Sequence, residues 1–235
     1  MNILTWGDLH GQDIWKKADV DRYDKIIFLG DYVDSFFLDD QTIIRTFTEV
    51  IDFKKQYPDK VVLLIGNHEI SYLMPQYCAT GYRASIAQEI LTLFWKNFDY
   101  FRIAFQYRKY LWTHAGIHKG WYYYKLKEKV EETDRNLADT LERLFIERYP
   151  PLFEIGWARG GAQYDVGGPF WLDASLLIKK PLAGLHQMVG HTHVKTIKHY
   201  KPYPKDPETT VTLCDCVERG DGSCYELFLD EIEEQ

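Results

Sequence analysis

The sequence lacks a long hydrophobic run, a surplus of basic residues and a basic amino-terminal segment, and each absence excludes a class of protein. Its longest apolar runs are about as long as residues 61–65, whereas a membrane-spanning helix needs about 20 apolar residues. Residues 1–6 contain no lysine or arginine and are soon followed by Asp8, so we expect neither a signal peptide nor a membrane segment. Lys and Arg total 28 against 35 Asp and Glu, a net charge of −7, which disfavours long nucleic acid as a partner.

Cysteine is also scarce, with only Cys78, Cys214, Cys216 and Cys224. Cys214 and Cys216 share one face of an expected strand, but no fourth ligand follows at the spacing of a zinc site. We therefore expect reduced structural cysteines and a cytoplasmic protein.

The 235 residues contain 46% hydrophobic and 27% charged residues, as in a globular domain. No linker composition or repeat interrupts them, so we predict one domain over residues 1–235. Short apolar runs at residues 2–6, 25–29 and 60–65 predict strands, and helical spacing of apolar residues predicts helices over 41–57 and 84–94. This alternation is typical of an α/β protein with parallel strands buried by helices.

The second half predicts further strands at residues 110–113, 187–189, 194–197, 209–214 and 224–229. Residues 122–148 have the pattern of an amphipathic helix or helix pair. Residues 156–168 are rich in glycine, which is typical of a functional loop. We expect residues 117–186 to form a helical cover inserted within the domain.

Five glycine-containing motifs each follow a predicted strand, at the sheet edge where ligands of α/β proteins bind. They read Gly7-Asp8-Leu9-His10-Gly11, Gly30-Asp31-Tyr32-Val33-Asp34, Gly66-Asn67-His68-Glu69, Thr113-His114-Ala115-Gly116 and Gly190-His191-Thr192-His193. Five of the eight histidines lie in these motifs, so the histidines are clustered rather than scattered.

Carboxylate, imidazole and amide oxygen without thiolate suit borderline divalent metals. The candidate ligands are Asp8, His10, Asp31, Asn67, His114, His191 and His193. Seven ligands are too many for one ion and suit two ions that share a bridging carboxylate, an arrangement that supports displacement at phosphorus. We predict two divalent ions per chain, Mn first and Fe, Zn, Co or Ni as alternatives. Such ions would also supply the positive charge that an acidic protein needs to bind a phosphate.

The order and spacing of the five motifs resemble the calcineurin-like metallophosphoesterases, close to the phosphoprotein phosphatase branch and its bacterial relatives. The resemblance extends from Asp8 to His193, and it implies an α/β fold of two mixed β-sheets packed as a sandwich and flanked by helices. It assigns Asp8, His10, Asp31 and His193 to a first metal ion. It assigns Asp31 as a bridge, with Asn67, His114 and His191, to a second ion. A metal-bridging hydroxide would attack phosphorus, and His68, oriented by Asp34, would act as the general acid.

The sequence departs from that family at one position. Phosphoprotein phosphatases usually continue the second motif with Arg-Gly, where the arginine binds phosphate, but here Ser35 and Phe36 follow Asp34. Arg159, in a glycine-rich Trp-x-Arg segment, is our first candidate for a substitute, and Arg83 is the second.

We therefore predict a metal-dependent phosphoric ester hydrolase, a phosphomonoesterase acting on a phosphorylated small molecule, nucleotide or phosphoprotein. Three alternatives remain open. They are a dinucleoside polyphosphate hydrolase, a phosphodiesterase or nuclease, and a metal-binding interaction module without catalysis.

Overall fold

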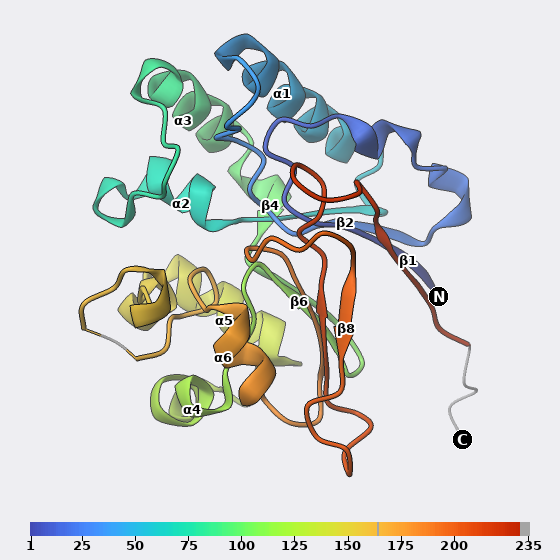
Figure 1. Ribbon diagram of the computed structural model, residues 1–235, viewed down its shortest axis with the longest axis vertical. Helices are drawn as coiled ribbons and strands as arrows, with labels where there is room; N and C mark the ends of the chain where they lie inside the picture. Colours follow the sequence, from blue (N-terminus) through green and yellow to red (C-terminus); the bar gives the residue numbers. More distant parts are fainter. Residues whose placement is uncertain (164, 231–235) are drawn as a thin grey trace.

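Two five-stranded β-sheets pack face to face in the computed structural model, which describes residues 1–163 and 165–230 (Figure 1). The first sheet has the order β10-β1-β2-β3-β4 and the second has the order β5-β6-β7-β9-β8. The strands of the first sheet are β1 (Asn2–Trp6), β2 (Lys25–Phe28), β3 (Val61–Leu64), β4 (Phe101–Arg102) and β10 (Tyr225–Phe228). Those of the second are β5 (Ala104–Tyr107), β6 (Tyr110–Thr113), β7 (His186–Val189), β8 (Lys198–Tyr200) and β9 (Thr210–Leu213).

Both sheets mix parallel and antiparallel strands. Strands β1 to β4 are parallel and β10 joins β1 antiparallel. In the second sheet β6, β7 and β9 are parallel, and β5 and β8 are the antiparallel edges. The predicted fold class, two mixed sheets with flanking helices, is confirmed.

Successive side chains of β1 pack into two different hydrophobic cores. Ile3 of β1 packs toward the second sheet with Trp112 and Met188, and Trp112 Nε1 donates a hydrogen bond to Thr5 Oγ1 at 2.9 Å. Leu4, the residue between Ile3 and Thr5, belongs instead to the core beneath the helices. Strands buried on both faces hold their register because a slip by one residue would exchange these two environments.

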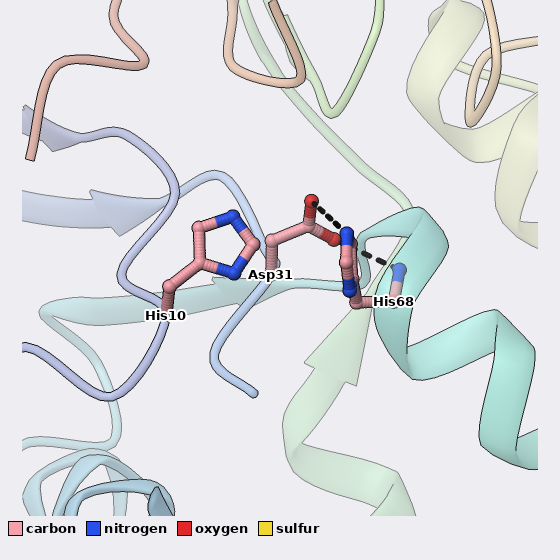
Figure 2. A group of neighbouring side chains, drawn as sticks. All are labelled: His10, Asp31 and His68. Atoms are coloured by element: carbon pink, nitrogen blue, oxygen red, sulfur yellow. Dashed lines mark hydrogen bonds and ion pairs between the residues drawn. The ribbon is translucent and has the colours of Figure 1, made fainter. Parts of the chain in front are cut away.

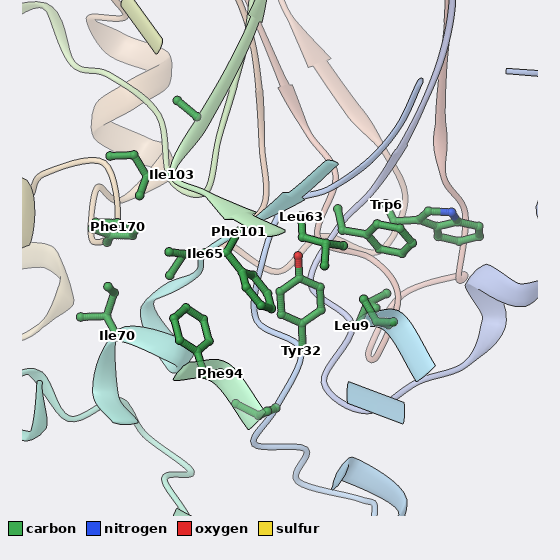
Figure 3. Packing of buried hydrophobic residues seen from close by; sticks show 14 of the residues in the cluster. Trp6, Leu9, Tyr32, Leu63, Ile65, Ile70, Phe94, Phe101, Ile103 and Phe170 are labelled. Atoms are coloured by element: carbon green, nitrogen blue, oxygen red, sulfur yellow. The ribbon is translucent and has the colours of Figure 1, made fainter. Parts of the chain in front are cut away.

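The helices lie outside the two sheets (Figure 1). They are α1 (Asp40–Gln56), α2 (Asn67–Leu73), α3 (Ala87–Lys96), α4 (Lys119–Trp121), α5 (Leu137–Ile146) and α6 (Ala174–Lys179). Helices α1 to α3 lie beside the first sheet, where Tyr32, Leu63, Phe94 and Phe101 form part of a continuous aromatic and aliphatic core (Figure 3). Within the described residues, no helix has both the length and the apolar character needed to cross a bilayer.

Two predicted elements differ from the structure. The prediction of a strand at 194–197 is wrong, because the strand in this region is β8 (Lys198–Tyr200). A loop precedes β8, and in it the Val194 N–H donates to the Asp215 carbonyl (2.8 Å). Residues 122–148 do not form one continuous helix. A π-helical turn (Tyr122–Leu126) and a 3₁₀ turn (Lys127–Lys129) come first, and Asn136 caps the separate helix α5 by accepting from the Asp139 N–H.

Residues 117–186 contain α4, α5 and α6, which lie together on the side of the second sheet (Figure 1). The segment is thus helical in part. Its role as a cover over the functional site stays a prediction.

Candidate metal centre

Most of the predicted metal ligands lie in turns that follow strands. Of the six non-glycine residues with positive φ among those described, four are predicted site residues: His10 (46°), Asp31 (52°), Asp34 (64°) and His191 (63°). Such backbone conformations are unfavourable for most side chains and collect at functional sites. The turns thus aim polar side chains at the carboxyl-terminal edge of the strands.

Asp31, only 2% exposed, stands at the middle of the cluster. Its carboxylate groups with His10 and His68, and separately with His114 and His191. Within each group the potential ligand atoms all lie within 4.8 Å of one another. Figure 2 shows His10 and His68 on opposite sides of the Asp31 carboxylate. One buried carboxylate shared by two ligand groups is the arrangement expected of a bridging ligand.

The backbone decides which nitrogen of each histidine faces the cluster. Nδ1 of His10 lies 2.8 Å from the Val33 carbonyl, and Nδ1 of His114 lies 2.8 Å from the Leu29 carbonyl. Because a carbonyl can only accept, each Nδ1 carries the proton and each neutral ring presents a bare Nε2. Hydrogen bonds of this kind commonly orient metal-binding histidines.

Asn67 completes the second group. Its Oδ1 lies 2.8 Å from His114 Nε2 and 2.8 Å from His191 Nδ1. Since His114 Nε2 carries a lone pair, it faces an oxygen lone pair without a proton between them. A cation at this point would accept both, so the donors present fit a divalent metal ion.

Asp8 is buried and accepts the His191 N–H at 2.9 and 3.1 Å. Burial, Asp215 and Asp31 raise the pKa of Asp8 well above its usual range. Burial also lowers the pKa of His114 and His191. Buried carboxylates and neutral imidazoles gathered in one place are the donors that a metal site presents to its ion.

His68 is the second residue of helix α2, and two carboxylates hold it. Its N–H donates to Asp31 Oδ1 (2.9 Å) and its Nδ1 contacts Asp34 Oδ2 (2.9 Å), while the Tyr72 hydroxyl donates to the other Asp34 oxygen. Burial alone would lower the pKa of His68, but Asp31 and Asp34 outweigh it and raise the pKa to about 9. The ring therefore carries its proton at neutral pH.

A cavity of about 310 Å³ opens over this cluster. It is lined by Asp8, His10, Asp31, Phe36, Asn67, His68, Thr80, Arg159, Trp171, His191, His193, Asp215, Glu218 and Arg219. A larger cavity of about 1000 Å³, between α4 and the end of α6, contains none of the predicted ligands.

The structure brings most of the predicted site residues together. Asp8 and His193 line the cavity but belong to neither ligand group, and His193 is exposed. Arg83 does not line the cavity, because its guanidinium bonds the Asp40 carboxylate and the carbonyls of Ser35 and Leu38. Arg159 does line it, with Nε 3.0 Å from Asp173 Oδ2.

Three ionisable residues of the cavity, Asp215, Glu218 and Arg219, were not among the predicted site residues. Asp215 lies two residues after the end of β9, so the same strand-end rule could have found it. Burial and Asp31 raise the pKa of Asp215 to about 7. Glu218 and Arg219 lie in the loop beyond it and carry no motif that would mark them.

Comparison with known proteins gives a consistent result. The family model described as calcineurin-like phosphoesterase matches residues 1–195. The serine/threonine-protein phosphatase 4 catalytic subunit of Eremothecium gossypii is 33% identical over 80 residues, which are 32% of this chain and 24% of that protein. The serine/threonine-protein phosphatase 6 catalytic subunit of Drosophila melanogaster is 32% identical over 80 residues, 32% of this chain and 25% of that protein. The chain thus spans about a quarter of the length of these curated relatives.

Among solved structures, the cold-active protein-tyrosine phosphatase of a psychrophilic Shewanella species has a similar fold. Its TM-score is 0.59 at 17% identity, covering 96% of this chain and 75% of that one. At that identity the likeness concerns the fold alone.

Proposed function

The chain belongs to the calcineurin-like phosphoesterase family, and on that premise we propose that it is a metal-dependent phosphomonoesterase. The observation that carries the proposal is the pair of candidate ligand groups that share the buried Asp31 carboxylate. When bound, two divalent ions at such a site activate water as a nucleophile and offset the charge of a phosphoryl group.

Seven side chains would hold these ions. Asp8, His10, Asp31 and His193 would hold the first, and Asp31, Asn67, His114 and His191 the second. Support comes from the bare Nε2 atoms of His10 and His114 and from the carboxylate that the two groups share. We expect Mn, with Fe, Zn, Co or Ni as alternatives, because the donors are nitrogen and oxygen.

His68 would be the general acid. Asp34 holds its Nδ1, so Nε2 is the nitrogen left to donate a proton to the leaving oxygen. Asp31 and Asp34 raise the pKa of His68 to about 9, which favours the protonated ring that a general acid needs. Asp34 is itself fixed by Tyr72, so the pair is a rigid orienting unit.

The substrate would be a phosphate monoester carried by a small molecule, a nucleotide or a phosphoprotein. Carboxylates at the cavity, among them Asp215 and Glu218, disfavour a long polyanion, in keeping with the net charge of −7. We place the protein in the cytoplasm, because all four cysteines are free. Residues 117–186 would cover the site.

Two measurements test the proposal. Elemental analysis of the purified protein should find two divalent ions per chain. The Mn-loaded protein should hydrolyse p-nitrophenyl phosphate in preference to bis(p-nitrophenyl) phosphate. A preference for the bis-ester would indicate a phosphodiesterase, a preference for diadenosine polyphosphate a polyphosphate hydrolase, and no turnover with metal bound an interaction module.

A further inference from the structure

Two arginines among the described residues line the metal cavity, and they differ in what already holds them. The Arg159 guanidinium donates to Thr192 Oγ1 and pairs with Asp173. Arg219 donates no hydrogen bond to any residue that the structure describes, and its nearest carboxylate oxygen, Glu218 Oε2, lies 3.6 Å from its Nε. Arg219 therefore offers the guanidinium with the larger number of uncommitted donors.

Two phenyl rings hold Arg219 in place. Its guanidinium carbon lies 4.7 Å from the Phe36 ring centroid and 5.8 Å from that of Phe37. The rings are 50% and 70% exposed, which is unusual for phenylalanine, and Phe36 itself lines the cavity. Cation–π contact restrains the guanidinium without consuming its N–H groups.

Hydrogen bonds join the loop that carries Arg219 to the segment after Asp34. Glu218 Oε1 accepts the Ser35 hydroxyl at 2.6 Å and the Phe36 N–H at 3.2 Å. Ser35 Oγ in turn accepts the N–H groups of Phe37 and Leu38, both at 3.1 Å. Ser35 is buried, so its side chain cannot reach a substrate. It anchors the loop that brings Arg219 to the cavity.

Cationic side chains at the cavity would add to the attraction that the metal ions exert on a phosphate. Four carboxylates of the described chain line it, those of Asp8, Asp31, Asp215 and Glu218. If all four carboxylates were ionised, two divalent ions would balance their charge and leave no net positive charge. A phosphate monoester that enters as a dianion then gains further attraction from the two arginines that line the cavity, Arg159 and Arg219.

We propose that Arg219 is the phosphate-binding residue of this chain. This inference rests on the proposed phosphomonoesterase function. Arg219 donates two N–H groups to non-bridging oxygens of the phosphoryl group, in place of the arginine that Ser35 replaces. Bidentate binding requires two free phosphoryl oxygens on one side, which a monoester offers together with a second negative charge.

The test compares the Mn-loaded wild-type protein with Arg219→Ala in two assays. Calorimetric titration with inorganic phosphate should show affinity weakened about tenfold or more, because the variant loses a bidentate, charge-assisted contact with the anion. KM for p-nitrophenyl phosphate should rise by a similar factor. Arg219→Lys should restore only part of both, because an ammonium cannot form the planar pair of hydrogen bonds.

Arg108→Ala is the matched control. Arg108 is also an exposed arginine over an aromatic ring, 5.2 Å from Tyr107, but it does not line the cavity. It should leave KM and phosphate affinity unchanged. If Arg219→Ala folds poorly, Arg219→Gln keeps much of the side-chain volume and takes its place.

A double-mutant cycle tests the aromatic support. Phe36→Leu should weaken phosphate binding by itself and have little further effect in the Arg219→Ala background, because Phe36 acts by holding the guanidinium. Equal losses in both backgrounds would show that the ring acts independently of Arg219.

The outcomes separate this inference from the proposed function. If the wild type hydrolyses the monoester and Arg219→Ala retains its KM and phosphate affinity, the inference is overturned and the function stands. If phosphate binding depends on Arg219 but no monoester is hydrolysed, the proposed function fails and the anion site stands. If the wild type with metal bound has no affinity for phosphate, the inference is overturned.

Discussion

Asp31 accepts the His68 N–H and belongs to both groups of candidate ligands, so its charge affects both proposed ions at once. Replacing it by asparagine keeps the shape of the side chain and removes the charge. We expect Asp31→Asn to lower metal occupancy and to reduce kcat/KM by more than the roughly 10–100-fold typical of losing an outer-shell partner. Elemental analysis and steady-state kinetics measure the two effects. Retention of two ions and of full activity would show that Asp31 is not a bridge.

His68 lies close enough to Asp31 and His10 to be a ligand, while its contact with Asp34 suits a general acid. His68→Asn distinguishes the two roles. As a general acid, its loss should leave the metal content intact and slow the reaction roughly 10²–10⁴-fold for a poor leaving group such as phenol. The loss for p-nitrophenol should be smaller, because that leaving group needs less protonation. A variant that loses an ion, or slows both substrates equally, would contradict the acid role.

At the scale of elements, the turn after β2 and the turn after β3 contact each other next to Asp31. Gly30 has φ of +101°, and a Cβ there would lie 2.4 Å from the Gly66 nitrogen. A Cβ on Gly66 would in turn lie 2.1 Å from Asp31 Oδ1. Only glycine lets the ends of β2 and β3 approach this closely. Glu69 accepts the N–H groups of Asp31 and Tyr32 and fixes the turn.

Gly30→Ala should therefore cost more stability than a left-handed glycine usually does. The conformation alone costs about 1–2 kcal/mol for a side-chain residue, and contact with the Gly66 backbone adds to that. Gly184→Ala is the matched control, because Gly184 has φ of +77° and a Cβ there would have no neighbour within 4 Å. Thermal unfolding of both variants measures the difference. Equal losses would show that the close approach of the two turns does not matter.

The elements around these turns were accessible from the sequence because local patterns specify them. Residues 2–6 and 25–29 are short apolar runs ended by Gly-Asp, and helical spacing placed a helix at 41–57 where α1 spans Asp40–Gln56. Strand β8 was misplaced because its three residues, Lys198 to Tyr200, lie on an exposed edge with no apolar alternation. An edge strand is specified by its neighbour rather than by its own sequence.

Part of the candidate site was likewise predictable from the sequence, and part was not. The ligands predicted from strand ends lie in or beside one cavity, because the carboxyl ends of parallel strands meet at one edge. Arg219 was not predicted, since the loop that carries it is held at the cavity by contacts distant in sequence, among them that of Glu218 with Ser35, 183 positions apart. Arg83 illustrates the converse, because a basic residue near a motif can be fully engaged by its own neighbourhood.

For the whole molecule, the buried acids couple stability to pH. Burial and Asp31 raise the pKa of Glu69 to about 8 and that of Asp215 to about 7. Burial lowers the pKa of His68, but Asp31 and Asp34 raise it overall to about 9. Between the unfolded values of these groups and their folded values, the folded protein binds more protons than the unfolded chain. Each group therefore loses its stabilising effect as pH rises from its unfolded value to its folded value, and the loss is complete at about pH 7 for Asp215, 8 for Glu69 and 9 for His68.

Three other histidines have the opposite effect on the pH dependence of stability, but only below about pH 6.5. Burial lowers the pKa of His10, His114 and His191 below the usual 6.5, so their effect favours folding as pH rises and ends near pH 6.5. Above that pH the acids and His68 act unopposed. The metal-free protein should thus lose stability steadily from about pH 6.5 to 8.5, at up to about 1.4 kcal/mol per pH unit for each excess proton.

Metal loading should change the sign of this dependence. Divalent ions bind the ionised carboxylates and neutral imidazoles, so they displace the protons that stabilise the metal-free fold and bind more tightly as pH rises. We expect the Tm of the metal-free protein to fall between about pH 6.5 and 8.5, and the Tm of the Mn-loaded protein to stay level or rise. Calorimetric scans of both forms at three pH values in this range measure it. Parallel slopes for the two forms would mean that the buried acids around Asp31 are not where the ions bind.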